Sequence, residues 1–503
     1  MALDEEAEDL AAAVALEPAH AGEPPPADAR PVPTLMKVLF GIGSMADGSQ
    51  TLILGGLLLL YYSQVLKLPT ATVSLAIGVS LFIDSFWDLL LAQFSDNLRS
   101  RLGRRHGLMY AAALPAAISF VCIWTPPAHL SQGQLFFWLF GSALAFRFSH
   151  SVYMVPSGAL LPELAKGYHD RTVLYAYRYL FGTIGGVIAA GFAYGLFLQP
   201  TPAHPQGQLN PAGYPPIGIT VGVLIAVTYL ISTVGTQSRI PTLYRPPAKR
   251  FTLGEVARQM WFILKNHNFL VATGAGMLSA TAGAMTGGLS IYFNTFMFHQ
   301  PAGNILWLIV TQLVSAPIAF VLAPSLARRF SKRTSFIILH ASSLVFVLGP
   351  ITLRLLGLLP PNGAPMLLPL LLTSTGIAGL FTTTGAILNT SMISDIVEEN
   401  QAKTGRRSEG VVLFCDRLLL KVAASLATIL PGIMLAIVHF PITTSEKPLA
   451  GPPGAIRDLA LIYVPLVIAL SAASMALLLL FRIDRNVHAR NLEAIAARSG
   501  SAP

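Results

Sequence analysis

The stretch ATVSLAIGVSLFIDSFWDLLLAQF, residues 71–94, is an apolar run long enough to cross a bilayer, and the basic string SDNLRSRLGRR follows it at 95–105. Two aspartates four residues apart, Asp84 and Asp88, interrupt the apolar run. At this spacing both carboxylates project from one face of a helix. Because an ionised carboxylate deep in a bilayer costs several kcal/mol, the pair predicts a cation-binding site inside a membrane-spanning helix.

The composition predicts an all-α integral membrane protein. Of the 503 residues, 53% are hydrophobic and 11% are charged, and the mean hydropathy is +0.61, which excludes an ordinary soluble domain. A spanning helix needs about 20 mostly apolar residues, and Gly, Pro and charge clusters separate such runs. Twelve runs fit this description: 38–62, 73–94, 107–124, 135–161, 173–198, 217–234, 269–297, 305–326, 336–359, 366–388, 411–440 and 456–481.

Lysine and arginine are concentrated in alternate loops. They follow spans 2, 4, 8 and 10, whereas loops such as TPPAHLSQGQ (125–134) and QPTPAHPQGQLNPAGYPP (199–216) contain neither residue. By the positive-inside rule, we expect a multi-pass protein of the cell inner membrane with both termini in the cytoplasm. The same bias explains the net charge of +9, so the lipid bilayer is an expected partner and a nucleic acid is not.

The distribution of polar segments predicts five parts. Residues 1–33 lack apolar periodicity and are expected to form a disordered acidic tail. A polar linker at 236–267 separates two six-helix halves, 34–235 and 268–482, and a cytoplasmic tail follows at 483–503. Within the linker, LGEVARQMWFIL (253–264) has the pattern of an amphipathic helix on the membrane surface. We expect the chain to act as a monomer.

The loop SDNLRSRLGRR is also a candidate gate. Asp96 lies near the end of its span, where it can pair with Arg104 and Arg105, and such a salt bridge would hold one conformer closed until it breaks. The alternative is a positive-inside loop without specific partners. The loop resembles a signature of the major facilitator superfamily, in which two six-helix halves rock about a site at the middle of the membrane.

Four separated blocks narrow the resemblance. They are DSFWDLLLAQFSDNLRSRLGRR (84–105), YMVPSGALLPEL (153–164), DRTVLYAYRY (170–179) and SMISDIVEENQAKTGRRSEGVVLFCDRLLLK (391–421). In this order they resemble the glycoside–pentoside–hexuronide:cation symporter family. The resemblance implies a transporter and not an enzyme, with no prosthetic group. It also implies a small-molecule substrate, a sugar, glycoside or uronide, moved together with Na⁺ or H⁺.

The resemblance also assigns a cation site. Asp84 and Asp88 match the family's cation-binding aspartates and would be metal ligands if the ion is Na⁺; Ser151 matches a coordinating hydroxyl, and Lys421 matches a lysine beside the site. Independently, Asp84 and Lys421 each lie about 10–12 residues into their spans, which places both near the midplane at about 1.5 Å per residue. The alternative is a structural ion pair between Lys421 and one aspartate, which would leave the other unexplained.

Five residues are candidates for substrate binding. Arg178 matches a family arginine that contacts sugar hydroxyls, although its position also suits a positive-inside anchor. Arg147, inside span 4, could neutralise an aspartate or hold an anionic substrate. His150 is expected to be a hydrogen-bonded helix residue, and its place next to the cation site also allows a proton role. Trp87 and Tyr153 are candidate aromatic platforms.

Departures from the family pattern leave the substrate open. Gly48 and Met154 occupy the places of two acids that bind sugar hydroxyls in the melibiose branch, and Gly158 replaces a stacking tryptophan. Asp47 is adjacent to Gly48 but points about 100° away around an ideal helix. An anionic or amphiphilic solute, such as an organic acid or a lysolipid, is therefore an alternative substrate.

Two further alternatives concern the role of the fold and the remaining charges. The chain could be a lipid flippase without ion coupling, or a non-transporting sensor with a transporter fold. Asp416 and Arg417 are ionisable residues inside span 11. As neighbours they point to different faces, so each is expected to pair with another helix.

Overall fold

The described chain is helical and spans a membrane many times. The computed structural model describes residues 32–98, 100, 102–165, 168–240, 253–404, 409–441 and 453–500, and no strand occurs among them. Within these described residues, eleven helical segments are long and apolar enough to cross a membrane. The remaining predicted span, 38–62, is formed by α2 (Thr34–Ile42) and α3 (Ser44–Leu60), which meet at Gly43. The all-α membrane fold is thereby confirmed.

The helices fall into two consecutive sets. After α2 and α3, the first set contains η1 (Tyr61–Val65), α4 (Thr70–Asn97), α5 (His106–Trp124), α6 (Gln132–Leu164), α7 (Tyr168–Ala190), η2 (Gly191–Phe197), η3 (Gly207–Leu209), η4 (Pro211–Gly213) and α8 (Tyr214–Gln237). The second contains α10 (His267–Tyr292), η6 (Phe293–Met297), α11 (Ala302–Arg329), α12 (Lys332–Leu355), α13 (Leu367–Thr404), α14 (Glu409–Ala427), α15 (Leu430–Ile437) and α16 (Pro453–Leu478). We refer to the sets as the first and second halves.

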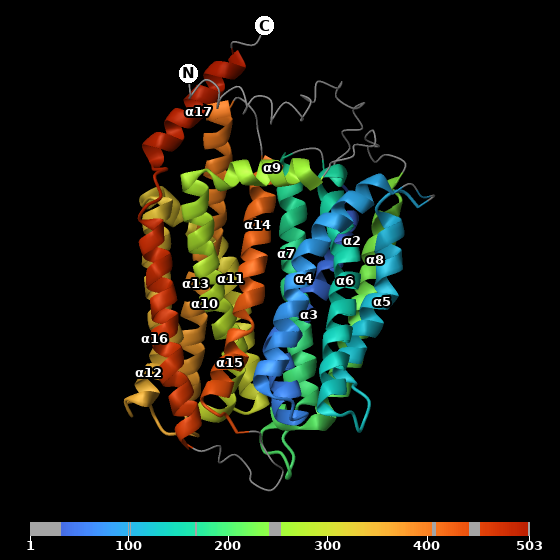
Figure 1. Ribbon diagram of the computed structural model, residues 1–503, viewed down its shortest axis with the longest axis vertical. Helices are drawn as coiled ribbons and strands as arrows, with labels where there is room; N and C mark the ends of the chain where they lie inside the picture. The colour runs from blue at the N-terminus through green and yellow to red at the C-terminus, as the bar shows by residue number, and fades with distance from the viewer. Residues whose placement is uncertain are drawn as a thin grey trace.

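Two further helices mark one end of the bundle. Figure 1 shows α9 (Leu253–Leu264) lying across the tops of the long helices and α17 (Arg485–Gly500) projecting beyond them. The segment predicted as an amphipathic surface helix is α9 itself. We call this the α9 end of the bundle and the other the opposite end. The two halves stand side by side, and α4 of the first packs against α14 and α15 of the second.

Glycines let α3 and α7 pack backbone against backbone. A Cβ atom at Gly185 would run into the main chain of Met45, and one at Gly48 would run into the carbonyl of Gly182. At Gly43, a Cβ would collide with the hydroxyl of Tyr153. These close contacts fix the first span against α7 and position the residues that follow Gly43, including the cavity residues described below.

Neutral hydrogen bonds join the halves at the opposite end. The hydroxyls of Ser63 and Tyr292 are 2.6 Å apart. The amide of Gln208 donates to Thr295 Oγ1 at 3.0 Å, and that of Gln206 donates to the Thr295 carbonyl at 2.9 Å. All of these groups are buried. The opposite end is therefore sealed between the halves by buried side chains without any charge.

The close packing of α3 on α7 predicts a contrast between two glycine substitutions. Gly185→Ala should lower stability by about 1–3 kcal/mol, because the added methyl overpacks the contact with Met45. Gly141→Ala, on α6 with nothing within 4 Å of its would-be Cβ, should be neutral or stabilising, because alanine favours a helix by about 0.5–1 kcal/mol. Thermal unfolding midpoints in detergent measure both, and equal midpoints for the two variants would refute the close packing.

Candidate functional site

Four residues predicted to form the cation site meet between the two halves. Lys421 Nζ on α14 lies 2.8 Å from Asp84 Oδ2 and 2.7 Å from Asp88 Oδ2, both on α4. Ser151 Oγ on α6 is within hydrogen-bond distance of both acids, 3.1 Å from Asp84 Oδ1 and 2.6 Å from Asp88 Oδ1. Asp84 and Ser151 are buried, whereas Asp88 and Lys421 are about one-third exposed. We call these four residues the cation cluster.

The lysine accounts for both carboxylates. The sequence suggested that an ion pair with Lys421 would leave one aspartate over, but the ammonium bridges the two. A structural ion pair therefore explains both acids as completely as a cation site does. Without the ammonium, two carboxylates and a hydroxyl would present oxygen ligands, the kind that hard cations prefer. The two acids can thus interact with Lys421, a metal cation or protons, and each of these would balance part of the same negative charge.

Arg147 supports this cluster from the same side of α6. Its Nε donates to Ser80 Oγ at 3.1 Å, and Ser80 lies on α4 one turn before Asp84. Arg147 is not among the residues that line the cavity described next. Of its two predicted roles, the geometry favours charge balance near Asp84 over direct contact with a substrate in that cavity.

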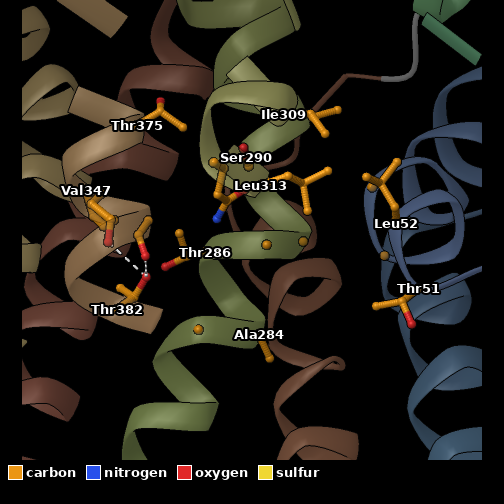
Figure 2. A pocket seen from close by; sticks show the side chains of 18 of the residues that line it. Thr51, Leu52, Ala284, Thr286, Ser290, Ile309, Leu313, Val347, Thr375 and Thr382 are labelled. Carbon is orange, nitrogen blue, oxygen red and sulfur yellow. Dashed lines mark hydrogen bonds between the residues drawn. The ribbon is translucent and has the colours of Figure 1, made fainter. Parts of the chain in front are cut away.

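A cavity of about 1360 Å³ lies between the halves. Its wall on the second half carries many hydroxyls, and Figure 2 shows Thr286 of α10 and Thr382 of α13 facing the space across from Thr51 and Leu52 of α3. The cavity also extends along α7 to Tyr175, near the α9 end. Neutral hydroxyls beside apolar side chains suit a polyhydroxylated solute, since each hydroxyl can both donate and accept.

Two residues of the first half bring charge to the cavity wall. Asp47 and Arg178 both line it. Asp47 Oδ1 lies 3.4 Å from His150 Nε2, and His150 Nδ1 is 2.7 Å from the Tyr229 hydroxyl. Arg178 donates from Nε to Ser44 Oγ at 3.2 Å. The wall thus combines a carboxylate held by an imidazole with a guanidinium held by a hydroxyl.

The other predicted substrate residues lie behind the wall. Trp87 packs edge-on against Phe148, with ring centroids 5.4 Å apart. Tyr153 is fully buried and stacks on Tyr229 at 3.5 Å. Neither they nor His150 line the cavity, so of the five predicted residues Arg178 alone lies on this wall. Trp87 and Tyr153 have packing roles in this conformation.

The arginines of the predicted gate form ion pairs with a residue of the first half. Arg104 and Arg105 both hold the carboxylate of Glu163 at the end of α6, and Arg105 Nε donates to Oε1 at 2.8 Å. The side chain of Asp96, the predicted acid of the gate, lies outside the described residues. The contacts that are described tie the loop before α5 to α6, so they stiffen the first half.

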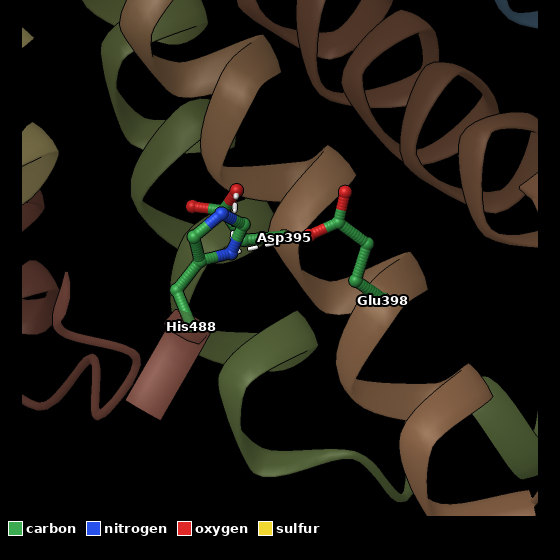
Figure 3. A group of neighbouring side chains, drawn as sticks. All are labelled: Asp395, Glu398 and His488. Carbon is green, nitrogen blue, oxygen red and sulfur yellow. Dashed lines mark ion pairs between the residues drawn. The ribbon is translucent and has the colours of Figure 1, made fainter. Parts of the chain in front are cut away.

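A second ion cluster lies at the α9 end of the other half. Figure 3 shows His488 of α17 beside Asp395 and Glu398 of α13, at 3.7 Å and 3.1 Å. Lys332 Nζ holds both oxygens of Asp395, at 2.6 and 2.8 Å. The acids and the imidazole are close enough to share a metal ion, but the ammonium already occupies the most buried carboxylate. The cluster therefore ties α12 and α17 to α13.

Sequence reasoning missed most of the cavity wall. Asp47 was set aside as pointing away from position 48, yet Asp47 and Gly48 both line the cavity. An acid within an apolar run was itself a signal for function. The hydroxyls of α13 carried a second signal, because Ser374, Thr375 and Thr382, which all line the cavity, lie within one apolar run.

The fold and the cavity define a class, a membrane transporter of two helical halves around a central site. The family model described as MFS/sugar transport protein matches residues 39–485. The chain belongs to this family of the major facilitator superfamily. It is therefore a transporter and not an enzyme, and the resemblance found in the sequence is confirmed.

Similar proteins agree with this assignment. The chain is 25% identical to an uncharacterized symporter of Synechocystis sp., over 92% of this chain and 96% of the relative. It is 23% identical to the isoprimeverose transporter of Lactiplantibacillus pentosus, over 85% and 84%. A crystal structure of a mutant of nucleoside transporter NupG has the same fold, with a TM-score of 0.61 at 16% identity over 88% of this chain and 98% of that one.

The bridging lysine predicts that a second substitution restores part of the stability lost by the first. Lys421→Ala should destabilise the protein by about 3 kcal/mol, at the lower end for a broken buried pair because the lysine is part exposed. Adding Asp88→Asn should restore part of the loss, since one uncompensated carboxylate disappears. Thermal unfolding of the single and double variants tests this, and a double variant no more stable than Lys421→Ala alone would contradict the bridge.

Proposed function

We propose that the chain is a cation-coupled symporter that moves a sugar, glycoside or uronide across the inner membrane by alternating access. The observation that carries the proposal is Lys421, which reaches from the second half to Asp84 and Asp88 of the first. A coupling cation that binds these acids must displace the lysine. Cation binding would thereby loosen a contact between the halves, which is what a transport cycle requires.

The competition supplies the coupling. With Lys421 in place, Lys421 and Arg147 together balance the charge of the two acids, and α14 is held against α4. With Na⁺ or H⁺ in place, the ion supplies the charge that Lys421 supplied, and α14 is free to move. A substrate that favours the rearranged state strengthens cation binding, and the cation strengthens substrate binding by the same factor. If the termini are cytoplasmic, the seal at the opposite end makes this conformation inward-facing.

The cavity supports a polyhydroxylated substrate. Its second-half wall is rich in hydroxyls and its charged pair, Asp47 and Arg178, lies on the first half. This is a surface that can exchange hydrogen bonds with a sugar in many orientations. One of the relatives is an isoprimeverose transporter and another a putative sulfoquinovose importer, which supports a sugar or a sugar derivative for this chain.

An anionic solute is the second candidate. Arg178 offers a guanidinium to the cavity, suited to a carboxylate or a sulfonate. A lipid substrate has less support, because α7 and α11 touch where a lateral entrance would be needed. There the rings of Tyr179 and Phe320 pack edge to face with centroids 4.9 Å apart.

The cation cluster predicts a specific ion effect on the purified protein. Na⁺ or acid should raise the unfolding midpoint of the wild type, because an ion bound only to the folded state stabilises it. Asp88→Asn should remove the effect, whereas Asp458→Asn, which changes an exposed acid on α16, should keep it. Choline replaces Na⁺ as the ionic-strength control. Should Asp88→Asn keep the full shift, the ion binds elsewhere.

Substituting Arg178 should distinguish between the substrate classes. A thermal-shift screen of neutral glycosides, uronides, organic acids and lysolipids first identifies a ligand. Arg178→Gln should then weaken binding about tenfold or more, the loss expected when a charged hydrogen bond is removed. Arg171→Gln is the matched control, because Arg171 bonds the carbonyl of Ala165 and does not line the cavity. A loss confined to uronides favours the anionic class, and no loss for any ligand removes Arg178 from the site.

A further inference from the structure

Another carboxylate, Asp416, is buried within a membrane-spanning helix, away from the cation cluster. Asp416 lies on α14 within the spanning segment Gly410–Ile437, and 7% of its surface is exposed. Its Oδ1 accepts a hydrogen bond from Thr273 Oγ1 of α10 at 2.8 Å. Arg417 is exposed on another face of the helix. The helix-to-helix partner expected for Asp416 is therefore a neutral hydroxyl.

The charged and titratable groups on the elements around α14 are engaged elsewhere or exposed. Among the described side chains, no ion pair reaches Asp416 within 4 Å. The titratable groups with described partners are Asp84 and Asp88 of α4, which Lys421 holds; Glu399 of α13, which Asn268 and Lys403 hold; and Asp395 and Glu398 of α13, which Lys332 and His488 hold. His267 of α10 lies beside the Leu480 carbonyl, and Arg258 of α9 and Lys265 after it are exposed. Cys415 of α14 is a buried thiol.

The one hydrogen-bond partner described for Asp416 is the hydroxyl of Thr273. One turn beyond Thr273 along α10, Gly276 makes room for Asn389 of α13, whose side-chain oxygen is buried and unpaired among the described residues. An ionised Asp416 adds acceptors only, and an unpaired ionised carboxylate in such a place is strongly unfavourable. A proton on Asp416 removes the charge and turns one of its oxygens into a donor.

We propose that Asp416 binds a proton in this conformation, so that the contact of α10 with α14 is a proton site separate from the cation cluster. The site has a route to the transport cycle, because Lys421 lies five residues further along the same helix, about 7.5 Å at 1.5 Å per residue. Loss of the proton leaves a charge between α10 and α14 and loosens their contact. The proton site thereby controls the helix that carries the bridging lysine, which extends the proposed cation coupling.

Infrared spectroscopy of the full chain in lipid tests the proton directly. At neutral pH the wild type should show the carbonyl stretch of a protonated carboxylic acid, with the small shift in D₂O that exchange of its proton produces. Asp416→Asn, which keeps the shape of the side chain and an oxygen for Thr273, should lose this band. Thr273→Val keeps the acid but removes the donor, so it should move the band to higher frequency.

The controls separate this proposal from the proposed coupling mechanism. Asp88→Asn should keep the Asp416 band, whatever it does to the Na⁺ effect. A band equally strong in wild type and Asp416→Asn, or absent from the wild type, overturns the proton site and leaves the cation cluster untouched. If Asp416→Asn does not fold, the Thr273→Val shift decides, and an unmoved band in that variant also overturns the proposal.

Discussion

Charge balance inside the bilayer is the constraint on which the rest of this structure depends. Asp84 and Asp88 cannot remain ionised in a spanning helix without partners, and Lys421 cannot remain there without them. The acids belong to one half of the molecule and the lysine to the other. Each half is therefore electrostatically incomplete by itself at this depth, and the contact between α4 and α14 completes both.

Two other kinds of interaction have different roles: ion pairs hold each half together, and neutral hydrogen bonds join the halves reversibly. Two ion pairs described at the α9 end each lie within one half, since Arg105 holds Glu163 and Lys332 holds Asp395. Buried pairs of this kind cost several kcal/mol to break by removing one partner, so they keep each half intact as it moves. The seal between halves at the opposite end uses neutral hydrogen bonds, each with a net value of about 1 kcal/mol. Such a seal can open without stranding a charge.

The sequence predicted how deep a residue lies in the membrane, because depth depends on distance along a helix. It did not predict which neighbour or cavity each side chain faces. Counting residues placed Asp84 and Lys421 at one depth, and the structure brings them together. The sequence could not predict that Trp87 and Tyr153 point toward neighbouring aromatic rings while Asp47 points to the cavity. Spanning helices are apolar on nearly every side, so periodicity carries little information about which face meets which neighbour. For Asp47, the glycine contacts of α3 with α7 fix which way the helix faces, and these contacts appear only in three dimensions.

The local charge also limits how coupling could work. Arg147 bonds Ser80 one turn before Asp84, so two basic side chains accompany two acids and the region is neutral with Lys421 in place. Adding a cation without removing the lysine would leave an excess positive charge in a poorly solvated site, an unfavourable state. Exchange of one for the other keeps the region neutral and changes only the contact between α4 and α14. In the proposed mechanism, neutrality itself makes ion binding and helix release a single event, so an ion that leaves Lys421 in place would need an anion with it.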